Sequence, residues 1–477
     1  MSLGTDIYKR LPVWAQHGAV SAYGAYWHWL RFGPGYSSYV RDYVEREKYS
    51  GAEWQKWQRQ RLAVVLKTAA TQVPYYRSAW RPDETRAALA GDLQDLPLLD
   101  KEPIRAQPLA FLSDGVRSWP QFTYHTSGST GTPVRTIWKI REIRNSLALR
   151  EVRSARWAGV SFGMPRATFS GRMVEPDPLS NGPFHRYNAA ERQLYFSPFH
   201  LRPDTARHYA DALRKHNVQW MTGYAVSHYL LAKLLVDQGI QAPKIRAVIT
   251  TSEKLTPSMR DVIERAYQTR VHEEYSTVES SLFASECQHG RLHLSPDVAV
   301  VEILRPDGTP CDPGEPGEVV ATSLIRDYQL FIRYRLGDVA SWDPEPCPCG
   351  RAMPILKEVV GRLEDVVVGP DGRLMVRFHG IFVDQPHIRE GQIIQEEIDH
   401  IRVKVVPADG FGEADVRDVV QRVQQRLTSS VRVDVETVSS IPRSKAGKFQ
   451  AVINRIPANG ARKNAGPETA EVGGRSR

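Results

Sequence analysis

Short apolar runs alternate with helix-spaced apolar positions across the middle of the chain. The predicted elements are strands at residues 218–224, 245–253 and 271–277 and helices at residues 225–240 and 256–268. The strand at residues 245–253 is a nearly continuous apolar run, which is typical of strands buried on both faces of a parallel sheet. Thr256 stands where the second helix begins and is a suitable N-cap. This alternation predicts an α/β domain with a mostly parallel sheet.

The pattern changes toward the C-terminus. From about residue 297, strand-like runs are broken by PDG and PGEPG turns, which predicts an antiparallel β subdomain. A smaller α+β domain follows, with strands expected at residues 401–407 and 431–438 and a helix at residues 413–428. Upstream, residues 50–80 have the pattern of an amphipathic helix that ends before Pro74.

These patterns divide the chain into four segments. They are an aromatic, basic, helical N-terminal segment (1–61), a large α/β domain with its β subdomain (62–363), a small α+β domain (364–458) and a tail (459–477). The tail is rich in Gly, Ala, Asn and Glu, a composition that predicts disorder.

Composition narrows the function classes. The chain has 477 residues, of which 41% are hydrophobic and 25% are charged, as in ordinary globular proteins. Its net charge of +9 is uneven, because residues 1–61 carry +4 and residues 457–477 carry +2. The remaining +3 is too small for the dense basic face of a nucleic-acid-binding protein, so we expect no nucleic-acid partner.

The N-terminal segment is unusually aromatic. Residues 14–40 contain Trp14, Tyr23, Tyr26, Trp27, Trp29, Phe32 and Tyr36, together with Arg31. One interpretation is a helix that packs on the main body or lines a substrate pocket. The other is an interfacial anchor, because Trp and Tyr beside Arg suit a membrane surface. Neither a signal-peptide core nor an apolar stretch of about 18 residues is apparent, and four cysteines fit a reducing compartment. We therefore expect a cytoplasmic monomer or dimer.

Three of the four cysteines predict a metal site. Cys347 and Cys349 are separated by one residue, and Cys287 lies in the segment ECQHGRLH. With His293 they form a Cys₃His set of the kind that binds structural Zn²⁺. Buried free thiols are the alternative interpretation, His289 is the alternative fourth ligand, and Cys311 is expected to lie outside the set.

A glycine-rich polar segment carries the strongest chemical signal. Residues 124–136 read YHTSGSTGTPVRT, with four hydroxyl side chains and two glycines from Thr126 to Gly131. Glycines let backbone N–H groups form a nest for an anion, to which hydroxyls add donors. No lysine follows at the spacing of a Walker A motif, so this is not a standard P-loop. A phosphate-binding loop and an ordinary polar turn both fit the segment.

The segment TSGSTGTP resembles the phosphate loop of the adenylate-forming acyl/aryl-CoA ligase superfamily, and further motifs follow in the family's order. They are Thr251-Ser252-Glu253, Tyr275–Glu279, Tyr334–Asp338, Gly361–Asp365 and Pro442–Lys448. The spacing and the segment CPCGR are most similar to the phenylacetate–CoA ligase branch, and within it to the capsular polysaccharide biosynthesis proteins. The resemblance implies a large α/β domain followed by a small mobile C-terminal domain.

The resemblance also implies an activity, its cofactors and its residues. The chain would activate a carboxylic acid with ATP and Mg²⁺ and pass the acyl group to CoA. Because attack on the α-phosphate builds up negative charge, the site needs fixed donors and positive charge. The implied nucleotide-binding residues are Thr126, Ser127, Gly128, Ser129, Thr130, Gly131, Thr132, Ser252, Glu253, Tyr275, Asp338 and Arg362.

Four further residues complete the implied machinery. Glu279 would bind Mg²⁺ through its carboxylate, and Lys448 would bridge the substrate carboxylate and the α-phosphate. Tyr224 would line the acyl pocket. The C-terminal domain would rotate at the hinge residue Glu364 after adenylation, which withdraws Lys448 and opens a channel for CoA.

Three positions depart from the family pattern. Val278 replaces a Thr, Ser276 replaces a Gly, and Glu364 replaces the hinge Asp. Two alternatives therefore stay open: adenylation with transfer to an acceptor other than CoA, and a degenerate nucleotide-binding module in polysaccharide biosynthesis. The sequence does not identify the acid.

Overall fold

The computed structural model contains two compact units. It describes residues 8, 11–114, 121–126, 134–170, 174–175, 181–362, 367–370, 374–375, 381–382, 385–442 and 450–456. The first unit holds the described residues up to Val359, and the second begins at Val360. The domain limits expected at residues 61, 363 and 458 stay predictions, and the tail 459–477 lies outside the described residues.

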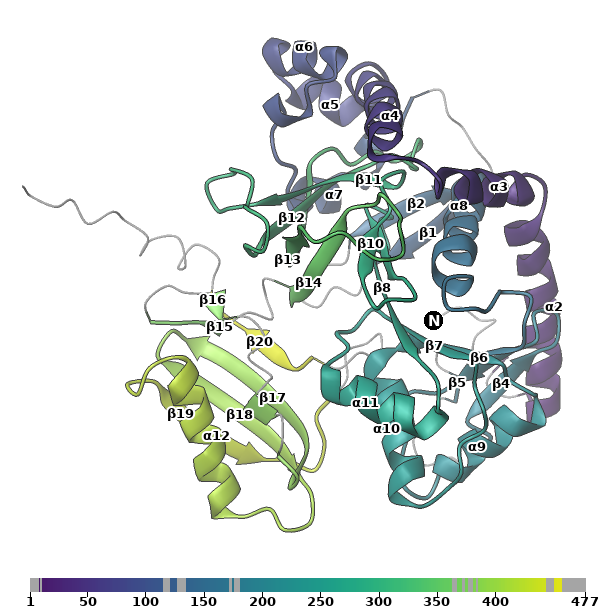
Figure 1. The fold of residues 1–477 in the computed structure, drawn as a ribbon, viewed down its shortest axis with the longest axis vertical. Helices are drawn as coiled ribbons and strands as arrows, with labels where there is room; N and C mark the ends of the chain where they lie inside the picture. Colours follow the sequence, from purple (N-terminus) through teal and green to yellow (C-terminus); the bar gives the residue numbers. More distant parts are fainter. Residues whose placement is uncertain are drawn as a thin grey trace, which may run out of the picture. The chain divides into compact units, whose positions relative to one another are not determined.

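A twelve-stranded sheet forms the centre of the first unit (Figure 1). Its parallel strands are β3 (Arg166–Phe169), β5 (Gln193–Phe196), β6 (Trp220–Tyr224), β7 (Ala247–Thr251) and β8 (Val271–Ser276). The helices between them are α9 (Ala206–Lys215), α10 (Ala225–Asp237) and α11 (Pro257–Tyr267). The predicted βα alternation is confirmed, and Thr256 caps α11 by accepting a hydrogen bond from the Met259 amide at 3.2 Å.

Alternating side chains bury both faces of these parallel strands. Met221 and Val248 pack in one cluster with apolar residues of α9, α10 and α11, whereas Trp220 and Ala247 pack with the segment 155–164 on the other face. Burial on both faces explains why the strands read as continuous apolar runs in the sequence.

The other half of the sheet is antiparallel. It contains β9 (Phe283–Glu286), β10 (Leu292–Leu294), β14 (Ile355–Arg362), β13 (Tyr334–Asp343), β12 (Gly317–Ser323) and β11 (Ala299–Leu304), in that spatial order. The predicted β subdomain is thus confirmed, and it continues the parallel sheet instead of forming a separate one. Within this half, the link between β10 and β14 is short, because β10 has three residues and pairs with β14 only through Leu292–Leu356 and His293–Ile355.

Helices form the N-terminal part of the first unit. They are α2 (Val13–Phe32), α3 (Tyr36–Arg46), α4 (Gly51–Gln72), α5 (Pro74–Ala79), α6 (Pro82–Ala90) and α7 (Lys101–Ala106). As predicted, α4 ends before Pro74, and it begins at Ser50, which forms a reciprocal capping box with Glu53. After the hairpin of β1 (Gln121–His125) and β2 (Arg135–Lys139), α8 (Ile140–Arg150) completes this part.

Helix α2 lies along β4 (His185–Asn188), one of the two edge strands of the large sheet (Figure 1). His17 Nδ1 accepts a hydrogen bond from the Tyr187 amide at 2.8 Å, and the ring of Trp27 packs against Phe122 at 5.0 Å. The helix therefore packs on the main body, as the first interpretation of its sequence required. Among the described residues, no helix is both long enough and apolar enough to cross a bilayer.

The second unit is a small α+β domain. Its strands β19 (Arg432–Thr437), β18 (His400–Pro407), β17 (Ile388–Glu397) and β20 (Val452–Asn454) form one sheet in that order, and β15 (Val367–Val368) pairs with β16 (Leu374–Met375). Helix α12 (Glu413–Arg426) contributes Val419 and Val423 to the buried core. The predicted helix and the strands β18 and β19 are confirmed.

Candidate functional site

The predicted phosphate loop connects two antiparallel strands. Thr126 follows β1, and its amide donates to the Val134 carbonyl at 3.1 Å, while the Val134 amide donates to Thr126 Oγ1 at 2.9 Å. These two bonds pair Thr126 with Val134 at the end of the β1–β2 hairpin. Ser127, Gly128, Ser129, Thr130, Gly131 and Thr132 lie outside the described residues, and their phosphate contacts stay a prediction.

Two predicted nucleotide-binding residues meet across the sheet. The Tyr275 hydroxyl on β8 donates to Asp338 Oδ2 on β13 at 2.7 Å. Three strands separate β8 from β13 in the sheet order, so a flat sheet would hold them about 19 Å apart. The sheet must therefore curl back on itself, which brings motifs 63 residues apart in sequence into contact.

The predicted Mg²⁺ ligand is hydrogen-bonded to the first residue of the same strand, β13. Glu279 is only 6% exposed, and its Oε1 accepts a hydrogen bond from the Tyr334 hydroxyl at 3.1 Å. Arg326, itself buried, donates to the Glu279 backbone carbonyl at 3.2 Å. Burial raises the pKa of Tyr334 above its usual value, and the Glu279 carboxylate raises it further, so the hydroxyl stays a donor. A buried carboxylate oriented in this way suits a hard cation such as Mg²⁺.

Ser276 and Val278, the two residues near Glu279 that differ from the family pattern, have different surroundings. Ser276 Oγ accepts a hydrogen bond from Arg150 at 2.9 Å and donates to Glu274 Oε1 at 3.2 Å, and Arg150 also pairs with Glu274 at 2.9 Å. Ser276 thus joins an ion pair between α8 and β8. Val278, by contrast, is 41% exposed.

The segment after β7 connects to the start of α10. Ser252 adopts a left-handed conformation with φ of 69°, and Glu253 Oε2 accepts a hydrogen bond from the Val226 amide at 2.9 Å. A carboxylate is favourable at a helix N-terminus, because the first amides of the helix lack backbone partners. This bond ties the segment to the end of β6, where Tyr224 is buried with 8% of its surface exposed.

Lys101 is a site residue that the sequence analysis missed. A Cβ atom at Gly337 would lie 3.0 Å from Lys101 Nζ, so the ammonium group sits directly beside Gly337 and next to Asp338 in the chain. The backbone brings it there, because Leu99 hydrogen-bonds with Arg333 and Arg335 at the start of β13. Lys101 belongs to none of the motifs found in the sequence, so no local pattern indicated this position.

Three predicted residues lack a described side chain. Arg362 ends β14, but only its backbone is described. Glu364 and Lys448 lie outside the described residues. The hinge and lysine roles therefore stay predictions.

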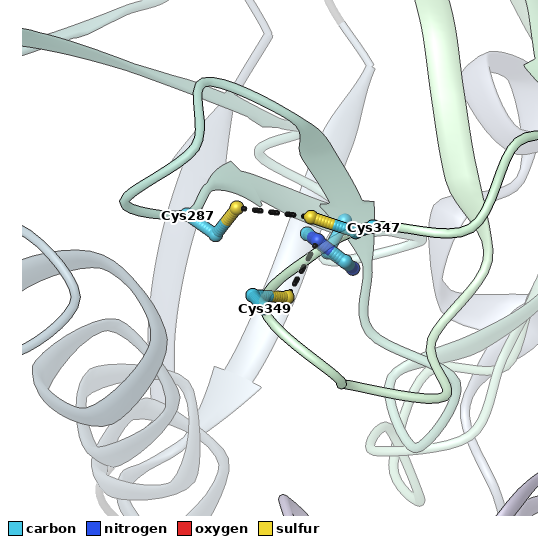
Figure 2. Close-up of side chains that lie close together, drawn as sticks. Cys287, Cys347 and Cys349 are labelled. Atoms are coloured by element: carbon cyan, nitrogen blue, oxygen red, sulfur yellow. Dashed lines mark hydrogen bonds between the residues drawn. The ribbon is translucent and has the colours of Figure 1, made fainter.

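The structure brings the four predicted zinc ligands together (Figure 2). Ligand atoms of Cys287, His293, Cys347 and Cys349 all lie within 4.8 Å of one another. Cys287 Sγ is 3.6 Å from Cys347 Sγ, and Cys349 Sγ is 3.4 Å from His293 Nε2. His289, the alternative ligand, is exposed.

In the metal-free cluster, burial determines which of the four side chains are protonated. It lowers the pKa of His293 to about 4, with a smaller contribution from Arg351, so the ring is neutral at neutral pH. It also raises the pKa of Cys347 to about 11. A cation that binds here would therefore displace thiol protons.

The chain resembles proteins of two kinds in sequence. Residues 369–455 match the CapK C-terminal domain family. Protein CapK of Staphylococcus aureus is 24% identical over 340 residues, which cover 69% of this chain and 74% of that protein. Phenylacetate-coenzyme A ligase of Escherichia coli is 25% identical over 434 residues, which cover 84% of this chain and 94% of that enzyme.

A solved structure extends this similarity to the fold. The 2-hydroxyisobutyryl-CoA ligase in the postadenylation state, in complex with R3-HIB-AMP, has a TM-score of 0.66 at 22% identity, over 86% of this chain and 91% of that one. At this identity the likeness concerns the fold. The chain is thus a homologue of Protein CapK and of the phenylacetate-coenzyme A ligases, and it has the fold of the adenylate-forming enzymes.

Proposed function

We propose that the chain is an AMP-forming ligase that activates a carboxylic acid with ATP and transfers the acyl group to CoA. This proposal rests on the contact between the motifs Tyr275–Glu279 and Tyr334–Asp338. They are joined by the Tyr275–Asp338 and Tyr334–Glu279 hydrogen bonds. Relatives named phenylacetate-coenzyme A ligase support the proposal, as does a structural neighbour that is a CoA ligase in complex with an acyl-AMP.

In the first step, a carboxylate oxygen attacks the α-phosphorus of ATP, and the bond from that phosphorus to pyrophosphate breaks. The loop 126–132 would bind the β- and γ-phosphates, and Asp338 would accept hydrogen bonds from the ribose. Mg²⁺ held by Glu279 would supply positive charge for the departing pyrophosphate. Lys448 would bridge the two reacting groups.

In the second step, the CoA thiol attacks the acyl carbon and AMP leaves. Rotation of the C-terminal domain at Glu364 would first withdraw Lys448 from the adenylate. With ATP and CoA as substrates and cysteines that are free thiols, we propose that the protein works in the cytoplasm.

Pyrophosphate release across a panel of aryl and aliphatic acids tests this function. We expect acid-dependent pyrophosphate in the absence of CoA, and an acyl-CoA detectable by mass spectrometry when CoA is added. Acid-dependent pyrophosphate without any acyl-CoA would indicate a different acceptor. ATP binding without pyrophosphate from any acid would support the degenerate module, which rests on the replacements at Val278 and Ser276.

We further propose that α2 rests on an anionic membrane surface. Its exposed positions are Trp14, Gly18, Ala22, Tyr23, Ala25, Tyr26, His28 and Trp29, which include no Asp, Glu, Lys or Arg. Trp14 is 77% exposed and Trp29 is 65% exposed. Trp and Tyr rings prefer the boundary between lipid and water, and Lys9 and Arg10 precede the helix in a segment of net positive charge, which complements anionic lipid.

Replacing Trp14 and Trp29 together with serine is expected to lower binding to phosphatidylserine-containing vesicles about 10-fold or more, because two exposed rings no longer enter the interface. Cosedimentation with vesicles measures this. Leu109→Ser is the matched control, since Leu109 is 59% exposed but lies outside α2. Equal sedimentation of the double variant and the wild type would refute the proposal, as would failure of the wild type to sediment.

A further inference from the structure

We propose that Cys287, His293, Cys347 and Cys349 bind one structural Zn²⁺ ion that joins the β9–β10 hairpin to the connection between β13 and β14. Zinc in a tetrahedral site has bonds of about 2.3 Å to sulfur and 2.0 Å to nitrogen, which gives edges of about 3.8 Å between sulfurs and 3.5 Å between sulfur and nitrogen. The distances of 3.6 Å between Cys287 Sγ and Cys347 Sγ and 3.4 Å between Cys349 Sγ and His293 Nε2 match these edges. A disulfide would need about 2.05 Å.

Two similar turns present the cysteines. Cys287 and Cys347 each stand three residues before a glycine, and the Gly290 and Gly350 amides donate to the Cys287 and Cys347 carbonyls at 3.0 and 3.1 Å. Both glycines are left-handed, with φ of 72° and 77°. In the first turn, the His289 amide also donates to Cys287 Sγ at 3.4 Å, an interaction that favours a thiolate. The backbone thus holds the sulfurs in position for a cation.

The surroundings fit a structural ion. Trp54, Met353 and Ile355 pack with Cys287 and Cys347 in one apolar cluster. The rings of Trp157 and His293 are nearly perpendicular, with their centres 5.9 Å apart, and the Arg351 guanidinium lies over Trp157 at 4.2 Å. Four protein ligands in a mostly apolar shell leave no open position for a substrate, which distinguishes a structural from a catalytic zinc.

The position of the cluster indicates what a bound zinc ion would do in the structure. Within the antiparallel half of the large sheet, the β9–β10 hairpin is joined to β14 by only two β10–β14 residue pairs. Cys287 and His293 belong to the β9–β10 hairpin, and Cys347 and Cys349 belong to the β13–β14 connection. One ion would therefore cross-link both sides of a weakly paired junction, much as a disulfide would, and this role is independent of the ligase activity.

The experiment is metal analysis of the full chain, purified without chelators. We expect about one zinc per chain, lost in Cys287→Ser, Cys349→Ser and His293→Gln. Cys311→Ser and His289→Gln should keep it, because Cys311 is buried outside the cluster and His289 is exposed. Removing zinc from the wild type should lower the melting temperature by about 10 °C, whereas a chelator should not change that of Cys349→Ser.

Cobalt titration keeps the test independent of how the variants fold. Co²⁺ added to the metal-free wild type should produce the visible absorption of a tetrahedral thiolate site, with saturation near one equivalent. Cys349→Ser should lack this absorption, and Cys349 is half-buried, so this variant should retain the fold. A metal-free protein that gives no cobalt spectrum would overturn the proposal, as would a Cys287–Cys347 disulfide in the purified chain.

Discussion

Replacing Lys448 with alanine is expected to slow acyl-adenylate formation about 100- to 1,000-fold, the range found when one preorganised donor is removed from a charge-stabilising site. The physical reason is that the carboxylate and the α-phosphate repel each other, and a lysine between them offsets the repulsion as the new bond forms. The measurement is acid-dependent pyrophosphate release at saturating ATP.

A matched control lies in the same segment. Lys445→Ala removes an equal charge three residues away and should leave the rate within a few-fold of the wild type. Thioester formation from a supplied acyl-adenylate should be nearly unchanged in Lys448→Ala, because the lysine is withdrawn before that step. A full adenylation rate in Lys448→Ala would show that this lysine has a different role.

The fold could be predicted where local patterns decide it. The strands β6 and β7 are buried on both faces, so their sequences are mostly apolar, and helices with helix-spaced apolar positions follow them. The same reasoning found α12 and its neighbouring strands. It missed β17, whose sequence IREGQIIQEE mixes charged and apolar residues without regular alternation. It also could not show that the antiparallel strands continue the parallel sheet.

The site depended more on long-range contacts. Spacing in the sequence brought Cys347 and Cys349 together and suggested Cys287, but the choice of His293 over His289 needed the register of β10. The motif resemblance pointed to Tyr275 and Asp338 separately. Their hydrogen bond, however, follows from the curl of a twelve-stranded sheet, which no local pattern encodes. Lys101 was missed for the same reason, since a distant segment places it beside Gly337.

Replacing Glu279 with glutamine is expected to lower pyrophosphate release about 100-fold and to raise the Mg²⁺ concentration needed for half-maximal rate about 10-fold. The amide has nearly the same shape and can still accept the hydrogen bond from Tyr334, so the buried position should stay filled. Only the negative charge is lost, and a hard divalent cation depends on that charge. The measurement is pyrophosphate release as a function of Mg²⁺ at fixed ATP and acid.

Two companion variants separate the charge from its surroundings. Tyr334→Phe keeps the Glu279 carboxylate but removes its donor, which amounts to about 1 kcal/mol, so we expect a rate loss of at most about 10-fold. Glu315→Gln removes a carboxylate bound to Arg305 in a distant turn of the sequence and should change neither the rate nor the Mg²⁺ requirement. If Glu279→Gln kept the wild-type Mg²⁺ dependence, Glu279 would only position Tyr334, and the cation would have to be held by other groups. We expect the loss of rate to be largest in Glu279→Gln, smaller in Tyr334→Phe and absent in Glu315→Gln. That order would mean that the curled sheet holds the Glu279 carboxylate in place to bind the metal.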